Sequence, residues 1–170
     1  MNPALLSSKR NDWRTPPELL GLVASMEGGI TLDPCAGEFI GGEFHLTEDG
    51  LSRSWASPGV TFCNPPYSRR LPLWTAKVVA EAALGQEIVL LVPARTDTRW
   101  WHRDIAARAD AICFLKGRLH FDGAKCGAPF PSAVCYYGER TKAFVRAFAG
   151  KGWTISQNLL PFGSPGEGAG

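Results

Sequence analysis

Short apolar runs alternate with helix-like segments along most of this 170-residue chain, and this alternation constrains the fold more than any other feature. The strand-like runs are rich in Val, Ile, Leu and Phe and occupy residues 30–33, 60–63, 87–92, 111–115, 132–137 and 153–155. The segments with apolar residues near helical spacing occupy residues 15–27, 71–84, 98–109 and 141–149. Strands that alternate with helices predict a compact α/β domain with a largely parallel sheet and an antiparallel C-terminal hairpin.

The start of the first helix has a recognisable sequence signature. Thr15 can act as the N-cap, Pro16 suits the first turn, and Glu18 stands three residues after Thr15, as in a capping box. Gly28 and Gly29 end the apolar pattern. We therefore expect the hydroxyl of Thr15 to cap this helix.

The length suits one domain with one core. We expect a flexible segment over residues 1–12, the domain over 13–160, and a disordered tail of Gly, Ser, Pro and Glu over 161–170. The sequence has neither the pattern of a signal peptide nor an apolar run long enough to span a bilayer. A cytoplasmic protein without a membrane partner is the expectation.

The five cysteines are odd in number, and none forms a C-x-x-C pair. The three histidines are equally scattered, so the clustered ligands of a zinc site are missing. The sequence therefore predicts reduced thiols packed as small hydrophobic groups, and no metal.

The segment Asn64-Pro65-Pro66-Tyr67 follows the second strand and carries the sharpest chemical signal. The prolines hold a stiff, extended turn whose carbonyls remain acceptors, and the Asn64 side chain adds another acceptor. Tyr67 adds a flat aromatic face. This set suits an amino group on a planar ring, because the acceptors can hold both N–H bonds while the aromatic ring stacks. Such contacts favour a pyramidal nitrogen whose lone pair can attack a methyl donor, so we expect Asn64, Pro65, Pro66 and Tyr67 to be the catalytic residues.

A second motif, Asp33-Pro34-Cys35-Ala36-Gly37, follows the first strand. A carboxylate at a strand end, followed by small residues, can accept hydrogen bonds from an ammonium group or from ribose hydroxyls. Asp49 is a further candidate carboxylate for binding a cofactor that carries such groups. An ordinary turn between a strand and a helix remains the alternative for both acidic residues.

Basic residues gather near these motifs, although the net charge of the chain is only +2. Trp100, Trp101 and Phe114 are interleaved with arginines, a pattern that suits a phosphate-contacting surface. The candidate DNA contacts are Arg69, Arg70, Arg95, Arg99, Arg118 and Phe121.

Several motifs, in order, resemble the phage-type DNA N6-adenine methyltransferase (Dam) family. They are Trp13-x-Thr15-Pro16, residues 31–36, residues 49–51 with Trp55, residues 63–68, Gly117-Arg118-Leu119-x-Phe121 and residues 128–133. The resemblance implies a Rossmann-like methyltransferase fold, S-adenosyl-L-methionine as the cofactor, and a flipped adenine in double-stranded DNA as the acceptor. It places Asp33 in the cofactor motif, Asn64 to Tyr67 in the target-base motif, and Thr15 and Pro16 near the methionine end of the cofactor.

The chain departs from larger relatives in two ways. Its first motif lacks the fuller glycine pattern, and only about 30 residues separate this motif from the target-base motif, so the usual second and third strands must be short or missing. No separate target-recognition domain fits, which leaves the loops 95–103 and 116–130 to read the sequence. We expect a bacterial host and a phage or prophage source, with or without a restriction partner, and a monomer or homodimer.

Three alternatives stay open. The enzyme could methylate another amine, namely that of RNA guanine or protein glutamine. It could methylate N4 of cytosine in DNA, whose chemistry is nearly identical. It could also be a catalytically silent DNA-binding protein on the same fold.

Overall fold

The computed structural model describes residues 14–35, 50–124 and 126–157. Its helices are α1 (Pro17–Ala24), α2 (Leu71–Ala83), α3 (Thr141–Ala147) and the π-helix η2 (Trp101–Ala106). Its strands are β1 (Ile30–Leu32), β2 (Val60–Cys63), β3 (Glu87–Pro93), β4 (Ala111–Leu115), β5 (Ser132–Tyr137) and β6 (Gly152–Ser156). Each strand-like run of the sequence thus forms a strand, with ends that differ from the predicted ones by one residue at most.

Within the described residues the strands form one open six-stranded sheet in the order β1-β2-β3-β5-β4-β6. The pairs β1–β2 and β2–β3 are parallel, whereas β3–β5, β5–β4 and β4–β6 are antiparallel. The prediction of an α/β domain is confirmed, and the antiparallel part at the C-terminal side is present. The expected largely parallel sheet is not confirmed, because β5 enters between β3 and β4 in the opposite direction and the sheet is mixed.

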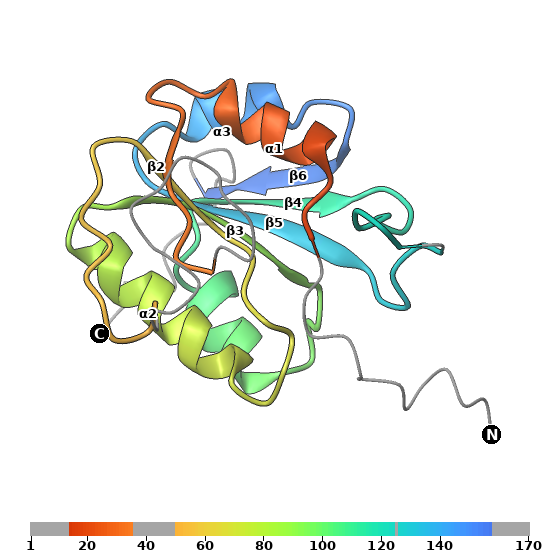
Figure 1. The fold of residues 1–170 in the computed structure, drawn as a ribbon, viewed down its shortest axis with the longest axis horizontal. Coiled ribbons are helices and arrows are strands. Elements are labelled where there is room, and N and C mark those ends of the chain that lie inside the picture. The colour runs from red at the N-terminus through yellow and green to blue at the C-terminus, as the bar shows by residue number, and fades with distance from the viewer. Residues whose placement is uncertain (1–13, 36–49, 125, 158–170) are drawn as a thin grey trace, which may run out of the picture.

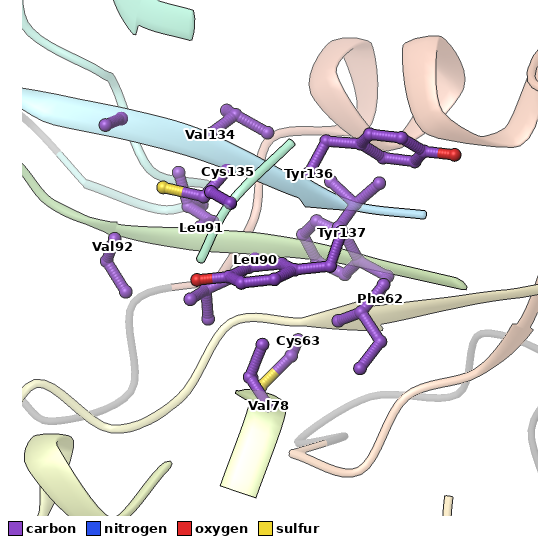
Figure 2. Close-up of a cluster of buried hydrophobic side chains, with 14 of the residues drawn as sticks. Phe62, Cys63, Val78, Leu90, Leu91, Val92, Val134, Cys135, Tyr136 and Tyr137 are labelled. Atoms are coloured by element: carbon purple, nitrogen blue, oxygen red, sulfur yellow. The ribbon is translucent and has the colours of Figure 1, made fainter. Parts of the chain in front are cut away.

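Helices cover both faces of this sheet (Figure 1). Helices α1 and α3 contact each other, and α3 packs on β4, β5 and β6, while α2 packs on β3 and on η2. The core between these layers includes Phe62, Val78 and Tyr137, and Figure 2 shows side chains from β2, β3, β5 and α2 meeting there. Strands β1 to β3 are parallel, and β4 runs the same way because both it and β3 are antiparallel to β5. We call the edge where β1 to β4 end the carboxyl edge.

Two local predictions change in the structure. The predicted helix over residues 98–109 contains the short π-helix η2, which tertiary hydrogen bonds hold in place. The hydroxyl of Thr75 in α2 donates to the Asp104 carboxylate at 2.6 Å, and the buried Tyr137 hydroxyl donates to the Asp104 carbonyl at 2.8 Å. The sequence also allows residues 119–121 to belong to a hairpin, but they form no strand in the structure. The predicted boundaries of the terminal segments fall on residues outside the described ranges.

Candidate active site

The two predicted motifs lie side by side at the carboxyl edge. Strands β1 and β2 are parallel neighbours, with Leu32 opposite Thr61, so the residues that follow each strand share one end of the sheet. The sulfur atoms of Cys35 and Cys63 are 3.5 Å apart. The structure therefore brings the loop after Asp33 against the strand end that precedes Asn64.

Asp33 is a buried carboxylic acid, with 7% of its surface exposed. Burial raises the pKa of its carboxyl group to about 7, and the Cys35 backbone N–H, which donates to Asp33 Oδ1 at 2.9 Å, partly offsets this rise. A buried carboxyl group with a pKa near neutrality can be ionised by a ligand that brings a positive charge or hydroxyl donors. This is the behaviour expected of a ligand-binding carboxylate.

The backbone at Gly50 comes against the same loop. A Cβ atom at Gly50 would lie 2.2 Å from the Pro34 carbonyl oxygen, so this approach requires glycine. The buried indole of Trp55 donates to the Gly50 carbonyl at 2.8 Å, and the Trp55 backbone N–H donates to buried Glu81 of α2 at 3.1 Å. The sequence analysis did not single out Glu81. The apolar spacing of the predicted helix over residues 71–84 is the signal that could have identified it, as a charged residue on the buried face.

Three residues predicted to bind the cofactor, Ala36, Gly37 and Asp49, lie outside the described residues. The contact between Gly50 and Pro34 nevertheless joins the ends of the two segments that flank them. The segments before residue 36 and after residue 49 therefore meet at the carboxyl edge, beside Asp33.

Asn64 is joined to the N-terminal motif by its side chain. Its Nδ2 donates to the Thr15 hydroxyl oxygen at 2.9 Å, across 49 positions of the sequence. The predicted capping role of Thr15 is wrong: Pro16 is the N-cap of α1 and no side-chain cap is formed. The sequence carried no signal for this contact, because the local pattern from Thr15 to Glu18 already suggested a role for Thr15 as a helix cap.

Tyr67 lies below the surface rather than presenting an open face. Its side chain is 9% exposed, and its hydroxyl donates to the Leu91 carbonyl of β3 at 3.3 Å. Burial raises the pKa of its phenol well above the usual range, so the hydroxyl stays a neutral donor. In the same turn, the Ser68 backbone N–H donates to the Pro66 carbonyl at 2.8 Å.

The loop between β4 and β5 covers the ring of Tyr67. Phe130 and Phe121 both contact this ring edge-to-face, with centroid distances of 5.5 and 6.2 Å. Phe121 is itself buried. The structure thus joins Tyr67, predicted to be catalytic, to Phe121, predicted to contact DNA, in one aromatic cluster.

The predicted DNA-contacting arginines follow three different strands. Arg69 and Arg70 come after β2, Arg95 and Arg99 after β3, and Arg118 after β4, and all five are exposed. All five therefore lie in segments that begin at the carboxyl edge. The structure separates Arg108 from them, because this residue precedes β4 and lines a cavity at the opposite edge.

The aromatic residues interleaved with these arginines are not a surface platform. Trp100 and Trp101 are buried, with 8% and 3% of their surfaces exposed, and Trp101 packs on Phe114 of β4. Hence the expectation that these tryptophans add to a phosphate-contacting surface is wrong, since both side chains belong to the buried core.

Two of the hollows in the described part of the chain lie at opposite ends of the sheet. A groove of about 270 Å³ runs beside Pro16 and Arg118 and has an apolar floor, with Lys116, His120 and Lys151 among its other lining residues. A larger cavity of about 820 Å³ lies at the other edge and is lined in part by Glu87, Asp110 and Arg140. We regard the smaller groove as the one relevant to the site, because the larger cavity has none of the predicted site residues in its lining.

The described part of the chain shows neither a cluster of metal ligands nor a membrane span. Among residues 14–35, 50–124 and 126–157, no three or more His, Cys, Asp or Glu side chains gather in a way that could hold a metal ion. In the same ranges, no helix has the length and apolar character required to cross a membrane.

Comparison with known proteins identifies one family. The sequence pattern of this family, described as DNA N-6-adenine-methyltransferase (Dam), matches residues 3–135. This match covers more than half of the chain and includes Thr15, Asp33 and the segment Asn64 to Tyr67. A search of curated proteins finds no match. The motifs at the carboxyl edge and the extent of this match together show that the chain belongs to the Dam family of DNA N6-adenine methyltransferases.

Proposed function

We propose that this protein transfers a methyl group from S-adenosyl-L-methionine to N6 of adenine at specific sites in double-stranded DNA. One observation carries the proposal. In a chain of the Dam family, the turn that begins at Asn64 lies beside the buried carboxyl group of Asp33 at the end of adjacent parallel strands. An acceptor set for an amine and a carboxyl group proposed for a cofactor therefore share one edge of the mixed sheet.

The residues around Asp33 fit the proposed cofactor. S-adenosyl-L-methionine supplies an electrophilic methyl group on a sulfonium and carries an ammonium group and ribose hydroxyls. Asp33 offers a buried carboxyl group with a pKa near 7, and the positive charge or hydrogen bonds of such a partner would lower this pKa. The backbone of Pro34, closely packed on Gly50, adjoins Asp33, and Pro16 follows Thr15, whose hydroxyl accepts from Asn64. Asp49, Ala36 and Gly37 are proposed to complete this site.

The amine of the adenine would be held by acceptors of the target-base motif. We assign one N–H of N6 to Asn64 Oδ1 and the other to the Pro65 carbonyl. Asn64 Oδ1 is shielded from solvent, where water competes little for a hydrogen bond. Catalysis then consists of positioning and electrostatic complementarity, and the proton of N6 leaves to solvent after the methyl group has been transferred.

The target base must leave the duplex to reach this turn, because N6 is inaccessible to the enzyme inside the stack. We propose that the flipped adenine stacks on Tyr67. Since Phe121 and Phe130 cover this ring in the free protein, the base takes the place of one of them, and the loop between β4 and β5 shifts on binding. The displaced phenylalanine can then cover the other face of the base.

DNA would approach the carboxyl edge, where the exposed arginines after β2, β3 and β4 can contact phosphates or bases. We propose that the loops 95–103 and 116–130 read the sequence. The described cysteines are free, which suits the reducing cytoplasm of a bacterial cell, the proposed setting for a phage or prophage enzyme.

Sequencing of modified bases tests this proposal directly. The chain would be expressed in a bacterial host that lacks adenine methylation, and N6-methyladenine should appear in one short sequence context. Asn64→Ala is the control: it should abolish the mark while the purified protein keeps its affinity for the cofactor. N4-methylcytosine instead of N6-methyladenine would refute the adenine assignment. Label transferred only to RNA or protein would refute DNA as the substrate, and specific DNA binding without any transfer would favour a silent binding protein.

A further inference from the structure

We propose that Thr15 is a positioning residue that holds the Asn64 carboxamide in place, an inference that rests on the proposed function. The observation is the hydrogen bond of 2.9 Å from Asn64 Nδ2 to Thr15 Oγ1. Both side chains are half-buried, and they come from segments 49 residues apart in the sequence. The family resemblance places Thr15 near the cofactor, so a direct contact with the target-base motif assigns it a different role.

The orientation of this amide matters because its two ends have opposite hydrogen-bonding character. The oxygen accepts, whereas the nitrogen only donates. If the amide turned by 180°, it would present N–H groups to the N–H groups of the adenine amine, and the contact would become repulsive. A hydroxyl can bond either end of the amide, so the contact with Thr15 holds the carboxamide in place rather than selecting one end. In the structure Thr15 accepts from Nδ2, which leaves Oδ1 pointing away from Thr15, where it can serve the substrate.

The backbone around Thr15 suits this task. Thr15 is followed by two prolines, and Pro16 has the extended angles φ −59° and ψ 137°, which hold the chain as it enters α1. The Thr15 hydroxyl makes no capping bond to the helix, so it is available to Asn64. Asn64 is held in turn by the stiff Pro65-Pro66 segment. Two proline-constrained segments therefore fix both ends of one hydrogen bond.

The kinetic test separates positioning from cofactor binding. Thr15→Val keeps the shape of the side chain and removes the hydroxyl. We expect kcat at saturating cofactor to fall about tenfold, since loss of one hydrogen bond frees the amide from its position by a factor of this order. The dissociation constants of the cofactor and of DNA should change by less than about twofold. Thr15→Ser keeps the hydroxyl and should restore kcat to near the wild-type value.

Each other outcome overturns the inference. Thr15→Val with wild-type kcat would show that the orientation needs no help from Thr15. A loss confined to cofactor affinity would return Thr15 to the cofactor site, and a Thr15→Ser variant as slow as Thr15→Val would exclude the hydroxyl. If Thr15→Val does not fold, Thr15→Ala is measured in its place. Alanine only removes side-chain atoms at this position, which lies just before α1.

A spectroscopic measurement keeps the inference testable even if the proposed function fails. The chain contains only four asparagines, so a sample labelled with ¹⁵N-asparagine gives a simple side-chain spectrum. Asn64→Ala identifies the Asn64 signals. In the wild type these amide protons should exchange slowly with solvent, and Thr15→Val, but not Thr15→Ser, should shift them and speed their exchange. Absence of N6-methyladenine in the wild type refutes the proposed function, whereas an unchanged spectrum in Thr15→Val refutes the positioning role.

Discussion

The hydroxyl of Tyr67 donates to the backbone carbonyl of Leu91, the residue of β3 that follows the last one paired with β2. The Tyr67 side chain thus adds a hydrogen bond between the turn after β2 and strand β3, just beyond the last paired residues of the two strands. This contact gives Tyr67 a structural role in addition to the proposed stacking role. The two roles predict different consequences for two substitutions at this position.

Tyr67→Phe keeps the ring and removes the donor to Leu91. The free energy of unfolding should fall by about 1 kcal/mol, as expected for one buried hydrogen bond, while turnover should change little. Tyr67→Ala should in addition weaken capture of the flipped base. Denaturant titration measures the first effect, and the fluorescence of 2-aminopurine at the target position, which rises when the base leaves the stack, measures the second. Equal loss of base capture in both variants would show that the ring face is not what holds the base.

Asp33 should make folding and cofactor binding depend on pH in opposite ways. Its carboxyl pKa is about 7 in the folded protein and close to 3.8 in the unfolded chain, so the folded state binds the proton more tightly. The contribution of this group to stability is therefore full below pH 4 and is lost as the pH rises through 7. At roughly 1.4 kcal/mol per pKa unit, the loss is of the order of 4 kcal/mol.

Asp33→Asn should remove this pH dependence, and the variant should be at least as stable as the wild type at pH 8. If the ionised carboxylate holds the cofactor, affinity of the wild type should increase from pH 5 to pH 8, and the variant should bind weakly at both. Thermal unfolding and calorimetry over this pH range check both statements. Tight, pH-independent cofactor binding by Asp33→Asn would remove Asp33 from the cofactor site.

The arginines after β3 should contribute to DNA affinity through phosphates. A combined Arg95→Ala and Arg99→Ala variant should bind DNA more weakly, and the slope of log affinity against log salt should decrease by about one for each phosphate that an arginine no longer neutralises. Arg108→Ala is the matched control, because it removes the same kind of charge from the opposite edge of the sheet. If Arg108→Ala weakened binding as much as either arginine of the pair, general charge rather than the carboxyl edge would explain DNA binding.

Cys126 should be the thiol that reacts rapidly in the native protein. It is exposed, whereas burial raises the pKa of the thiols of Cys35, Cys113 and Cys135 and lowers their thiolate fraction. Titration with a chromogenic disulfide reagent at pH 8 should show one fast thiol, which Cys126→Ser removes. A fast thiol that remains in the Cys126→Ser variant would mean that one of the other cysteines becomes accessible readily in solution.

Most elements of the fold could be predicted because their signals are local. The strands over residues 60–63 and 87–92 follow from apolar runs, and β3 extends only one residue beyond the second run, to Pro93. The roles of individual aromatic residues could not be predicted in this way. Trp100 and Trp101 are next to arginines in the sequence, but both side chains are buried, and Trp101 packs on Phe114 of β4.

The amino-acid sequence by itself determined the strands, the placement of Asp33 and Asn64 directly after two of them, and the membership of the Dam family. Only the tertiary structure decided the mixed direction of the sheet and the partner of Thr15. The physical reason is the range of the interactions. Helical periodicity and turn geometry depend on neighbouring residues, whereas the insertion of β5 between β3 and β4, and the bond between Thr15 and Asn64, depend on which distant segments pack together.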